Sequence, residues 1–423
     1  MTYAPSSSRL LRTAAIAAAT LCTATVALAP PAAADSFGDQ CNFPNKMYPG
    51  RPWALQRVLL DELWSQSKGK NVRVAVIDTG VDTKNPQLTH AVDASSGANL
   101  LPDKNGKGQK IDRGKADGTT DTVGHGTRVA GIIAARPSQG TGFVGLAPEA
   151  TIIPIKQNDA DGDGTAETLA AAIEHAIREK AQVINISQDT ANAVQPADGL
   201  RRAIDDALRH QIVVVASAGN DGLDGNDKLT YPASYPGVLA VAASDRNNER
   251  AAFSQSGDFV GVAAPGVDMI STVPQGGHCS DSGTSFSAPY VAGVAALIKA
   301  KHPGWTAREV VAQIEQTAER SVAGHDHLVG WGVVDPVRAL TDDDHPIEKP
   351  TPKEGLTRAQ APTPARLVLG ETADERNARL ATYVAVGAAV LVAALAGVAV
   401  AIRDARRRPA AGGAGTSGAV NDT

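Results

Sequence analysis

The sequence predicts an α/β fold in which a parallel, doubly wound sheet carries helices on both faces. Between about residue 69 and residue 340, short β-branched apolar runs alternate with longer helical patterns. Continuous apolar runs are typical of strands buried on both faces, and their alternation with helices indicates crossover connections between parallel strands. The expected strands are Val72–Ile77, Thr151–Lys156, Val183–Ser187 and Ile212–Ala216, and the expected helices are one that begins at His125, then Glu167–Lys180, Asp198–Arg209 and Thr284–Lys301.

The last expected helix carries Pro289, which we place in its opening turn, followed by the apolar series Val291–Ile298. Proline is tolerated in a first turn because the amides there have no intrahelical partner. Ser285 is therefore expected at a helix N-terminus, where the free amides and the helix dipole favour negative charge.

Composition indicates one large globular domain with appendages. The chain has 423 residues, of which 43% are hydrophobic and 20% charged. Its formal net charge of -5 at pH 7 provides no general basic field of the kind that nucleic-acid binding requires. We therefore expect no nucleic-acid partner.

The N-terminus has the pattern of a secretory signal peptide, which we assign to residues 1–34. Arg9 and Arg12 precede an apolar run from Thr13 to Ala29, and the alanines at 32–34 offer a cleavage site. An uncleaved N-terminal anchor is the alternative, but the run is short and alanine-rich for a membrane span. In both cases the protein is expected to leave the cytoplasm.

A second apolar segment, residues 381–402, is long enough to cross a hydrocarbon core of about 30 Å. The arginine-rich tail that follows, residues 403–423, favours a cytoplasmic C-terminus. Residues 341–380 contain several prolines among charged and small residues, so we expect an extended tether. This arrangement places the large domain outside the cytoplasmic membrane, anchored by a single span.

Three cysteines are present, and Cys22 would be lost with the signal peptide. The remaining two, Cys41 and Cys279, would lie in a compartment where disulfides persist. We favour a bridge between them, which would tie the N-terminal extension close to Ser285. Two free thiols are the alternative.

Three motifs along the chain each contain one residue of a possible charge-assisted nucleophilic system. They are Val74–Gly80 with Asp78, Gly124–Thr127 with His125, and Gly283–Pro289 with Ser285. A serine hydroxyl is a weak nucleophile near neutral pH, so acyl transfer needs an imidazole to accept its proton and a carboxylate to hold the imidazole tautomer. We interpret Ser285 as the nucleophile, His125 as the general base and Asp78 as the carboxylate that orients it.

A fourth motif ends the apolar run Val213–Ala216 with small residues and Asn220. The Asn220 amide and the Ser285 backbone N–H are the expected donors to a developing oxyanion, and an ordinary turn residue is the alternative reading of Asn220. An α/β-hydrolase acting on small esters is disfavoured, because no Gly-x-Ser-x-Gly elbow surrounds Ser285.

With these four motifs, residues 69–340 resemble the subtilisin-like serine proteases, or subtilases. The order of aspartate, histidine and serine matches that of subtilisin. The resemblance implies a subtilisin-like fold, endopeptidase activity on protein or peptide substrates, and no cofactor.

The resemblance also implies that two segments bind an extended peptide substrate by strand addition. They are Asn185–Asp189, with Ser187 and Gln188, and the segment Gly162, Asp163, Gly164. Where the family usually has glycines after the serine, this chain has Gln188 and Asp189, which predicts an occluded or polar P1 pocket and a narrow or gated specificity.

The run Asp159–Gly164 imitates the start of a calcium loop, but Ala170 stands where an EF-hand has its bidentate glutamate. We interpret the run as a polar loop that leads to a helix cap at Thr165. No metal site is expected from this segment.

The order of segments narrows the resemblance to mycosins, the membrane-anchored subtilases associated with type VII secretion in actinobacteria. The extension, residues 35–68, is too short for the usual inhibitory prodomain, and the resemblance implies that it wraps the catalytic domain. The leading hypothesis is an extracytoplasmic endopeptidase that processes proteins exported by a type VII system. The alternative is a structural component that docks to the membrane components of that system and cleaves little.

Overall fold

The computed structural model describes residues 41–102, 104, 108, 110, 112–159, 164–188, 198–224, 228–353 and 373–407. The chain divides into two compact units, residues 1–358 and residues 359–423. The signal peptide predicted for residues 1–34 lies outside the described residues.

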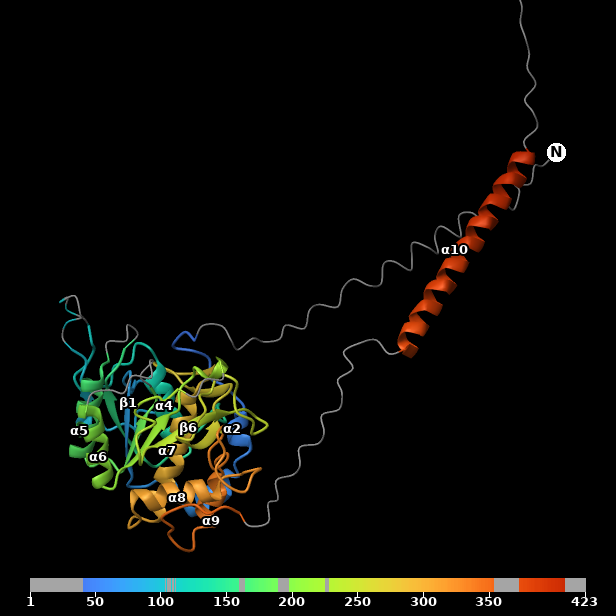
Figure 1. Ribbon diagram of the computed structural model, residues 1–423. Helices are drawn as coiled ribbons and strands as arrows, with labels where there is room; N and C mark the ends of the chain where they lie inside the picture. Colours follow the sequence, from blue (N-terminus) through green and yellow to red (C-terminus); the bar gives the residue numbers. More distant parts are fainter. Residues whose placement is uncertain are drawn as a thin grey trace, which may run out of the picture. The chain divides into compact units, whose positions relative to one another are not determined.

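A seven-stranded sheet forms the centre of the first unit (Figure 1). Its strands lie in the order β2-β3-β1-β4-β5-β6-β7, and each neighbouring pair is parallel. The predicted parallel α/β architecture is confirmed. The strands are β1 (Arg73–Asp78), β2 (Ala98–Asn99), β3 (Thr151–Lys156), β4 (Val183–Ile186), β5 (Val213–Ser217), β6 (Leu239–Ser244) and β7 (Val260–Pro265).

Helices cover both faces of the sheet, and the side chains of β1 show why. Val74 and Val76 pack into one hydrophobic cluster with α4 and α7, whereas Ala75 and Ile77 pack into another with α5 and α6. Alternate residues of a strand point to opposite faces, so a strand that is apolar throughout requires two covering layers. The helices of the first unit are α2 (Trp53–Gln56), α3 (Leu60–Gln66), α4 (His125–Ala134), α5 (Ala166–Arg178), α6 (Asp198–Arg209), α7 (Thr284–Lys301), α8 (Ala307–Thr317) and α9 (Pro336–Thr341), with short 3₁₀ turns at Ala94–Ser96 and Gly222–Asp224.

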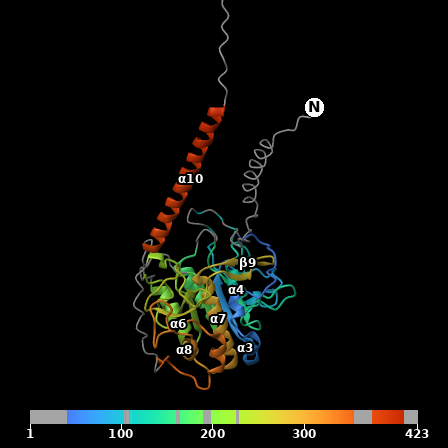
Figure 2. The same ribbon diagram turned by 90° about the vertical axis from the view of Figure 1, so that its right-hand side faces the viewer.

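Helix α7 is buried along almost its whole length and contacts β4 to β7 as well as α4, α8 and α9 (Figure 2). Pro289 lies in the second turn of α7, not in its opening turn as the sequence analysis expected. Because proline has no N–H, the carbonyl of Ser285 lacks the helical hydrogen bond that residue 289 would otherwise donate.

An antiparallel hairpin, β8 (Met269–Thr272) and β9 (His278–Asp281), leads directly into α7. Neither this hairpin nor strands β6 and β7 were predicted from the sequence. Strands β6 and β7 are rich in alanine, which has low β propensity, so their pattern is weak without the neighbouring strands.

The first described residues of the N-terminal extension, from Cys41, are fixed to this hairpin. A disulfide bond joins Cys41 to Cys279, the pair that the sequence analysis favoured. Close by, the Asn45 N–H donates to the Gly276 carbonyl over 3.0 Å. Gly277 has φ +85°, and a Cβ there would lie 1.8 Å from the Asn45 carbonyl oxygen, so the two backbones meet at a distance that only glycine allows.

The rest of the extension contributes to the core of the first unit. Leu55 of α2 and Leu63 of α3 are buried in the same hydrophobic cluster as α4 and α7. The Trp64 indole N–H donates to the Leu146 carbonyl over 2.9 Å. Helices α2 and α3 therefore share one core with the domain that was predicted to begin at residue 69.

The predicted tether, residues 341–380, differs from expectation at both ends. Asp343 is buried and its Oδ2 lies 2.7 Å from the Lys301 ammonium. Further along, the Thr351 N–H donates to the Gln316 side chain over 2.6 Å. The first part of the segment thus binds the domain, and the last part is helical.

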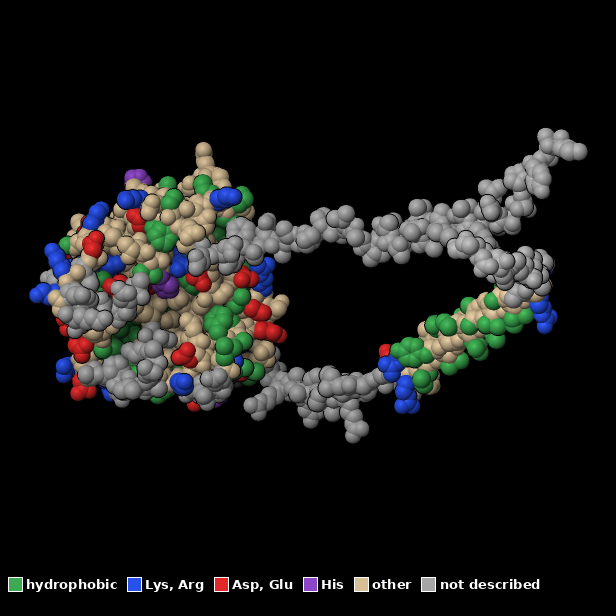
Figure 3. All heavy atoms as spheres, turned by 90° about the horizontal axis from the view of Figure 1, so that it is seen from above, with side chains coloured by type: hydrophobic (Ala, Val, Ile, Leu, Met, Phe, Trp, Pro, Cys, Tyr) green, Lys and Arg blue, Asp and Glu red, His purple; other side chains and the backbone are tan. Residues whose placement is uncertain are grey.

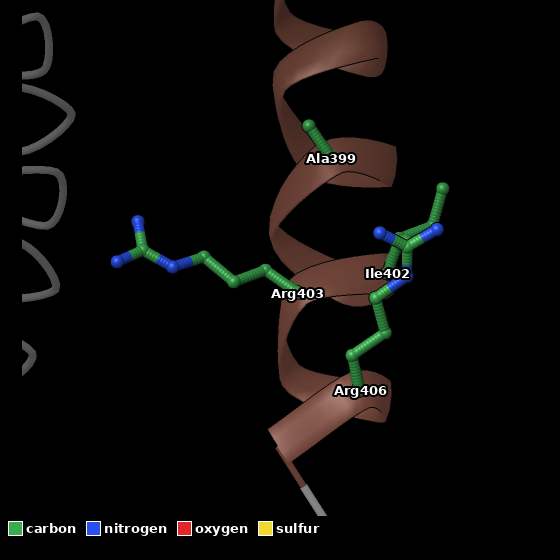
Figure 4. Close-up of a pocket in the computed structure, with 4 residues that line it drawn as sticks. All are labelled: Ala399, Ile402, Arg403 and Arg406. Atoms are coloured by element: carbon green, nitrogen blue, oxygen red, sulfur yellow. The ribbon is translucent and has the colours of Figure 1, made fainter.

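The second unit contains α10 (Ala373–Arg407), which is longer than the predicted span, residues 381–402. Within Asp374–Asp404, an 18-residue window has a mean hydropathy of 2.6, so the helix is long and apolar enough to cross a membrane. Figure 3 shows apolar side chains along its surface and basic side chains at both ends. Near its C-terminal end, Arg403 and Arg406 extend from different sides of the helix beside Ala399 and Ile402 (Figure 4).

His278 is a buried anchor for the extension and is held in its neutral form. The Tyr48 N–H donates to Nδ1 of His278 over 3.1 Å, and Nε2 lies 2.8 Å from the Gln87 Oε1. The Gln87 amide nitrogen donates to the carbonyls of Arg136 and Phe143, so its oxygen faces the imidazole. Nδ1 must accept, and the imidazole proton therefore lies on Nε2. Burial lowers the pKa of His278 to about 4.

This environment predicts an acid-sensitive stability. The ordinary histidine pKa is 6.5 and the folded value is about 4, so the unfolded chain binds the proton first as the pH falls. The stabilisation that the neutral His278 contributes is complete above pH 6.5 and is lost as the pH falls toward 4. The loss lowers the free energy of unfolding by on the order of 3 kcal/mol. Urea denaturation of the full chain in detergent, followed by tryptophan fluorescence, should show a flatter pH dependence for His278→Gln than for the wild type. His210→Gln, at an exposed histidine, is the control, and equal slopes for wild type and His278→Gln would contradict the prediction.

Candidate active site

Asp78 and His125 lie together where the sheet meets the first turn of α4. Asp78 is the last residue of β1 and is 2% exposed, and His125 is the first residue of α4. The His125 Nδ1 lies 2.8 Å from the Asp78 Oδ1. Burial lowers the pKa of His125, but the charge and hydrogen bond of Asp78 outweigh it and the net pKa is raised. Asp78 therefore orients the imidazole and leaves Nε2 available for proton transfer.

The close approach of α4 to the end of β1 depends on the glycine that follows His125. A Cβ added at Gly126 would lie 2.1 Å from the Gly80 carbonyl oxygen and 3.1 Å from the Asp78 Cβ. The Gly126 N–H donates to the Thr79 hydroxyl over 2.9 Å. Any larger residue would move the helix, and His125 with it, away from Asp78.

A second buried carboxylate at this site, Asp121, was not predicted from the sequence. It accepts hydrogen bonds from the N–H groups of Gly124 and Thr127, at 2.7 and 2.9 Å, and from the Thr79 hydroxyl at 2.9 Å. Burial raises the pKa of Asp121, and the hydrogen bonds from Thr127 and Gly124 oppose that rise. Asp121 thus caps α4 and links it to the residue after Asp78. An aspartate just before a glycine-initiated helix was the available signal.

Lys156, the last residue of β3, lies beneath this pair. It is buried, and its ammonium donates to the carbonyls of Thr79 and Thr120 at 2.8 and 3.3 Å. Burial lowers the pKa of Lys156, while Asp121 acts in the opposite direction. The lysine therefore holds the two loops that follow β1 and precede α4.

Ser285 and Asn220 flank the same small space beside Gly283. Ser285 is the second residue of α7, and a Cβ built on Gly283 would lie 3.0 Å from the Ser285 Oγ and 3.7 Å from the Asn220 Nδ2. The Asn220 Oδ1 accepts from the Thr284 N–H and hydroxyl at 2.9 and 3.1 Å. Thr284, which the sequence analysis did not single out, thereby turns the amide N–H groups of Asn220 toward this space.

The first turns of α4 and α7 meet through Phe286. Its ring centroid lies 5.3 Å from that of His125, and its backbone follows Ser285 directly. Helices α4 and α7 are in contact. The structure thus brings the three sequence-predicted residues Asp78, His125 and Ser285 to one end of the sheet.

Part of the predicted substrate-binding surface is described. Ser187 and Gln188 follow β4 directly, and the Gln188 side-chain amide donates to Gln157 Oε1. The Gln157 amide in turn donates to the Thr165 carbonyl over 3.1 Å, and a Cβ on Gly164 would lie 2.8 Å from its Nε2. Gln157, missed by the sequence analysis, therefore connects the two predicted segments. Gly162, Asp163 and Asp189 lie outside the described residues.

Residues 69–332, which contain this constellation, match the subtilase family, Peptidase_S8. The chain belongs to the subtilase family. It is 35% identical to subtilisin E of Bacillus subtilis over 285 residues, which cover 67% of this chain and 69% of that protein. It is 37% identical to a subtilisin of Bacillus pumilus over 67% of this chain and 96% of that protein. This subtilase is therefore a serine endopeptidase.

Solved structures confirm the subtilisin-like fold and the predicted resemblance to mycosins. The MycP3 protease from the type VII (ESX-3) secretion system is 35% identical, with a TM-score of 0.60, over 71% of this chain and 90% of that chain. MycP1 from Mycobacterium smegmatis is 30% identical, with a TM-score of 0.61, over 75% of this chain and 91% of that chain.

The close packing around Gly126 predicts that one added methyl group will lower the catalytic activity strongly. Gly126→Ala should lower kcat/KM at least about tenfold, because displacement of α4 lengthens the contact between His125 and Asp78. Steady-state hydrolysis of a peptide substrate, normalised to folded protein by circular dichroism, measures the effect. Gly304→Ala is the control, since a Cβ there meets nothing within 4 Å. Equal activity of the two alanine variants would contradict the prediction.

Proposed function

We propose that Asp78, His125 and Ser285 are the catalytic triad of this subtilase and that Asn220 is an oxyanion donor. The observation that carries the proposal is the 2.8 Å contact between His125 Nδ1 and Asp78 Oδ1 at the start of α4. Ser285, in the first turn of the adjacent helix, supplies a partly exposed hydroxyl within the region that matches the family.

In the acylation step, the Ser285 Oγ attacks the carbonyl carbon of the scissile peptide bond, and its proton passes to the His125 Nε2. Asp78 stabilises the imidazolium that forms and keeps its own negative charge. The carbonyl oxygen becomes an oxyanion, which accepts hydrogen bonds from the Asn220 amide and the Ser285 N–H. His125 then gives its proton to the leaving amine as the C–N bond breaks, and an acyl ester remains on Ser285.

In the deacylation step, water attacks the ester carbonyl while His125 accepts its proton. The proton then returns to the Ser285 oxygen as the C–O bond breaks, so that a free carboxylate leaves and the enzyme is regenerated. No cofactor takes part in this cycle.

Covalent labelling tests the triad. The full-length protein in detergent should react with a fluorophosphonate probe, and Ser285→Ala and His125→Ala should abolish the labelling because nucleophile and base are removed. Ser287→Ala and His210→Ala are matched controls that should still label, since Ser287 is buried in α7 and His210 is exposed. Persistent labelling of Ser285→Ala would refute the assignment of Ser285 as the nucleophile.

The proposed oxyanion donor is tested separately by steady-state peptide hydrolysis. Asn220→Ala should lower kcat by roughly 10²–10³.

We further propose that the protease acts outside the cytoplasmic membrane, anchored by α10, and processes proteins exported by a type VII secretion system. Support comes from the apolar helix, from the basic residues after it, and from the similarity to MycP3 and MycP1, whose structures are described as type VII secretion components. Its partners would be the cytoplasmic membrane and type VII membrane components, and its substrates exported proteins.

A docking role with little cleavage is the competing proposal. Gln188 favours it, because its side chain occupies the segment where the family usually has glycine and bonds to Gln157. Complementation of a strain that lacks this protein separates the protease role from the docking role. Processing that is lost in Ser285→Ala but present with Ser287→Ala supports the protease role. Secretion that is restored by Ser285→Ala as fully as by wild type supports the docking role instead.

A further inference from the structure

Arg128 occupies a position between the two helices that carry the catalytic groups, and the mechanism above does not use it. It lies one turn after His125 on the same side of α4 and is 9% exposed. Its Nε donates to the Gly124 carbonyl over 3.2 Å, so the guanidinium is held to the residue that precedes His125. A buried arginine needs such partners to offset the cost of desolvation.

The same guanidinium contacts both segments that flank Ser285 in sequence. It forms an ion pair with Asp281, the last residue of β9, ahead of the turn into α7. It also lies over the ring of Phe286, the residue after Ser285, with 5.3 Å between the Cζ and the ring centroid. The flat face of arginine suits such a cation–π contact. The Arg128 guanidinium therefore contacts the chain on each side of Ser285.

The ring of Phe286 therefore lies against two side chains of α4, those of Arg128 and His125. Phe286 is 2% exposed, and its ring lies 5.3 Å from the His125 ring, at an interplanar angle of 48°. Movement of the ring would therefore change the relation between the Ser285 turn and the imidazole.

We propose that Arg128 is a positioning residue for peptide hydrolysis: through Asp281 and Phe286 it fixes the turn that carries Ser285 relative to His125. This inference rests on the proposed triad. A lysine cannot reproduce it fully, because a lysine ammonium has neither the planar fork nor the stacking face.

The charge of Arg128 also acts on the general base. The charged groups with the largest effects on His125 are Asp78 from β1, Arg128 on α4 and Asp121 from the loop before α4. Asp78 and Asp121 raise the pKa of His125, and Arg128 lowers it, while Asp281 from β9 partly neutralises Arg128. Removal of the Arg128 charge should therefore shift the acidic limb of the pH profile to higher pH.

The test is the pH dependence of kcat/KM for the full-length protein in detergent, with a peptide substrate and with active sites counted by fluorophosphonate labelling. Arg128→Met should move the acidic limb upward and lower kcat roughly tenfold with KM little changed. Arg128→Lys should restore the acidic limb but not all of kcat. Arg73→Met is the control, because Arg73 pairs with Asp93 at 3.1 Å at the opposite end of β1 and should leave the profile unchanged.

The pH profile of Asp281→Asn is a second test that does not require Arg128→Met to fold. The Asp281 side chain is 41% exposed, so its substitution should not disturb folding. With the carboxylate gone, the uncompensated guanidinium should move the acidic limb to lower pH and lower kcat. Unchanged profiles in Asp281→Asn and in any folded Arg128→Met protein would overturn the role of Arg128. Labelling that survives Ser285→Ala would instead overturn the triad and this inference together, so the two failures are distinguishable.

Discussion

The contact between Asp78 and His125 is the interaction on which the rest of the site depends. It joins the carboxyl end of a central strand to the first residue of a helix, and the two backbones must meet closely for it to form. The missing Cβ of Gly126 permits this approach, since an added carbon would lie 2.1 Å from a carbonyl oxygen. Asp121 then accepts hydrogen bonds from the Gly124 and Thr127 amides, and the Thr79 hydroxyl accepts one from the Gly126 amide, so these amides at the start of α4 have partners.

The sheet topology explains why residues so far apart in sequence converge. Strand β1 lies between β3 and β4, and the strands of this sheet run in parallel, so their carboxyl ends share one edge. Asp78 ends β1 at this edge, and Ser187 and Asn220 come just after β4 and β5. Ligand sites of parallel α/β sheets lie at this edge. Helix α7 completes the site because it begins there, and its apolar length fills the core beneath.

The N-terminal extension is part of this architecture and not a separate appendage. Leu55, Leu60 and Leu63 lie in the main core, and Cys41 is bonded to the hairpin that leads to Ser285. The neutral, buried imidazole of His278 joins the same hairpin to Tyr48. The disulfide and this hydrogen bond therefore tie the extension to the hairpin that precedes Ser285.

The sequence by itself determined the strands that are continuously apolar, the helices with clear periodicity and the order of Asp78, His125 and Ser285, because these are local patterns. Only the tertiary structure showed the long-range partners of Asp121, Gln157, Thr284 and Arg128. Each is an ordinary polar residue with at least one partner distant in sequence, and only packing shows which donors and charges it meets there. The alanine-rich strands β6 and β7 were equally hidden, because their stability comes from neighbouring strands and not from intrinsic propensity.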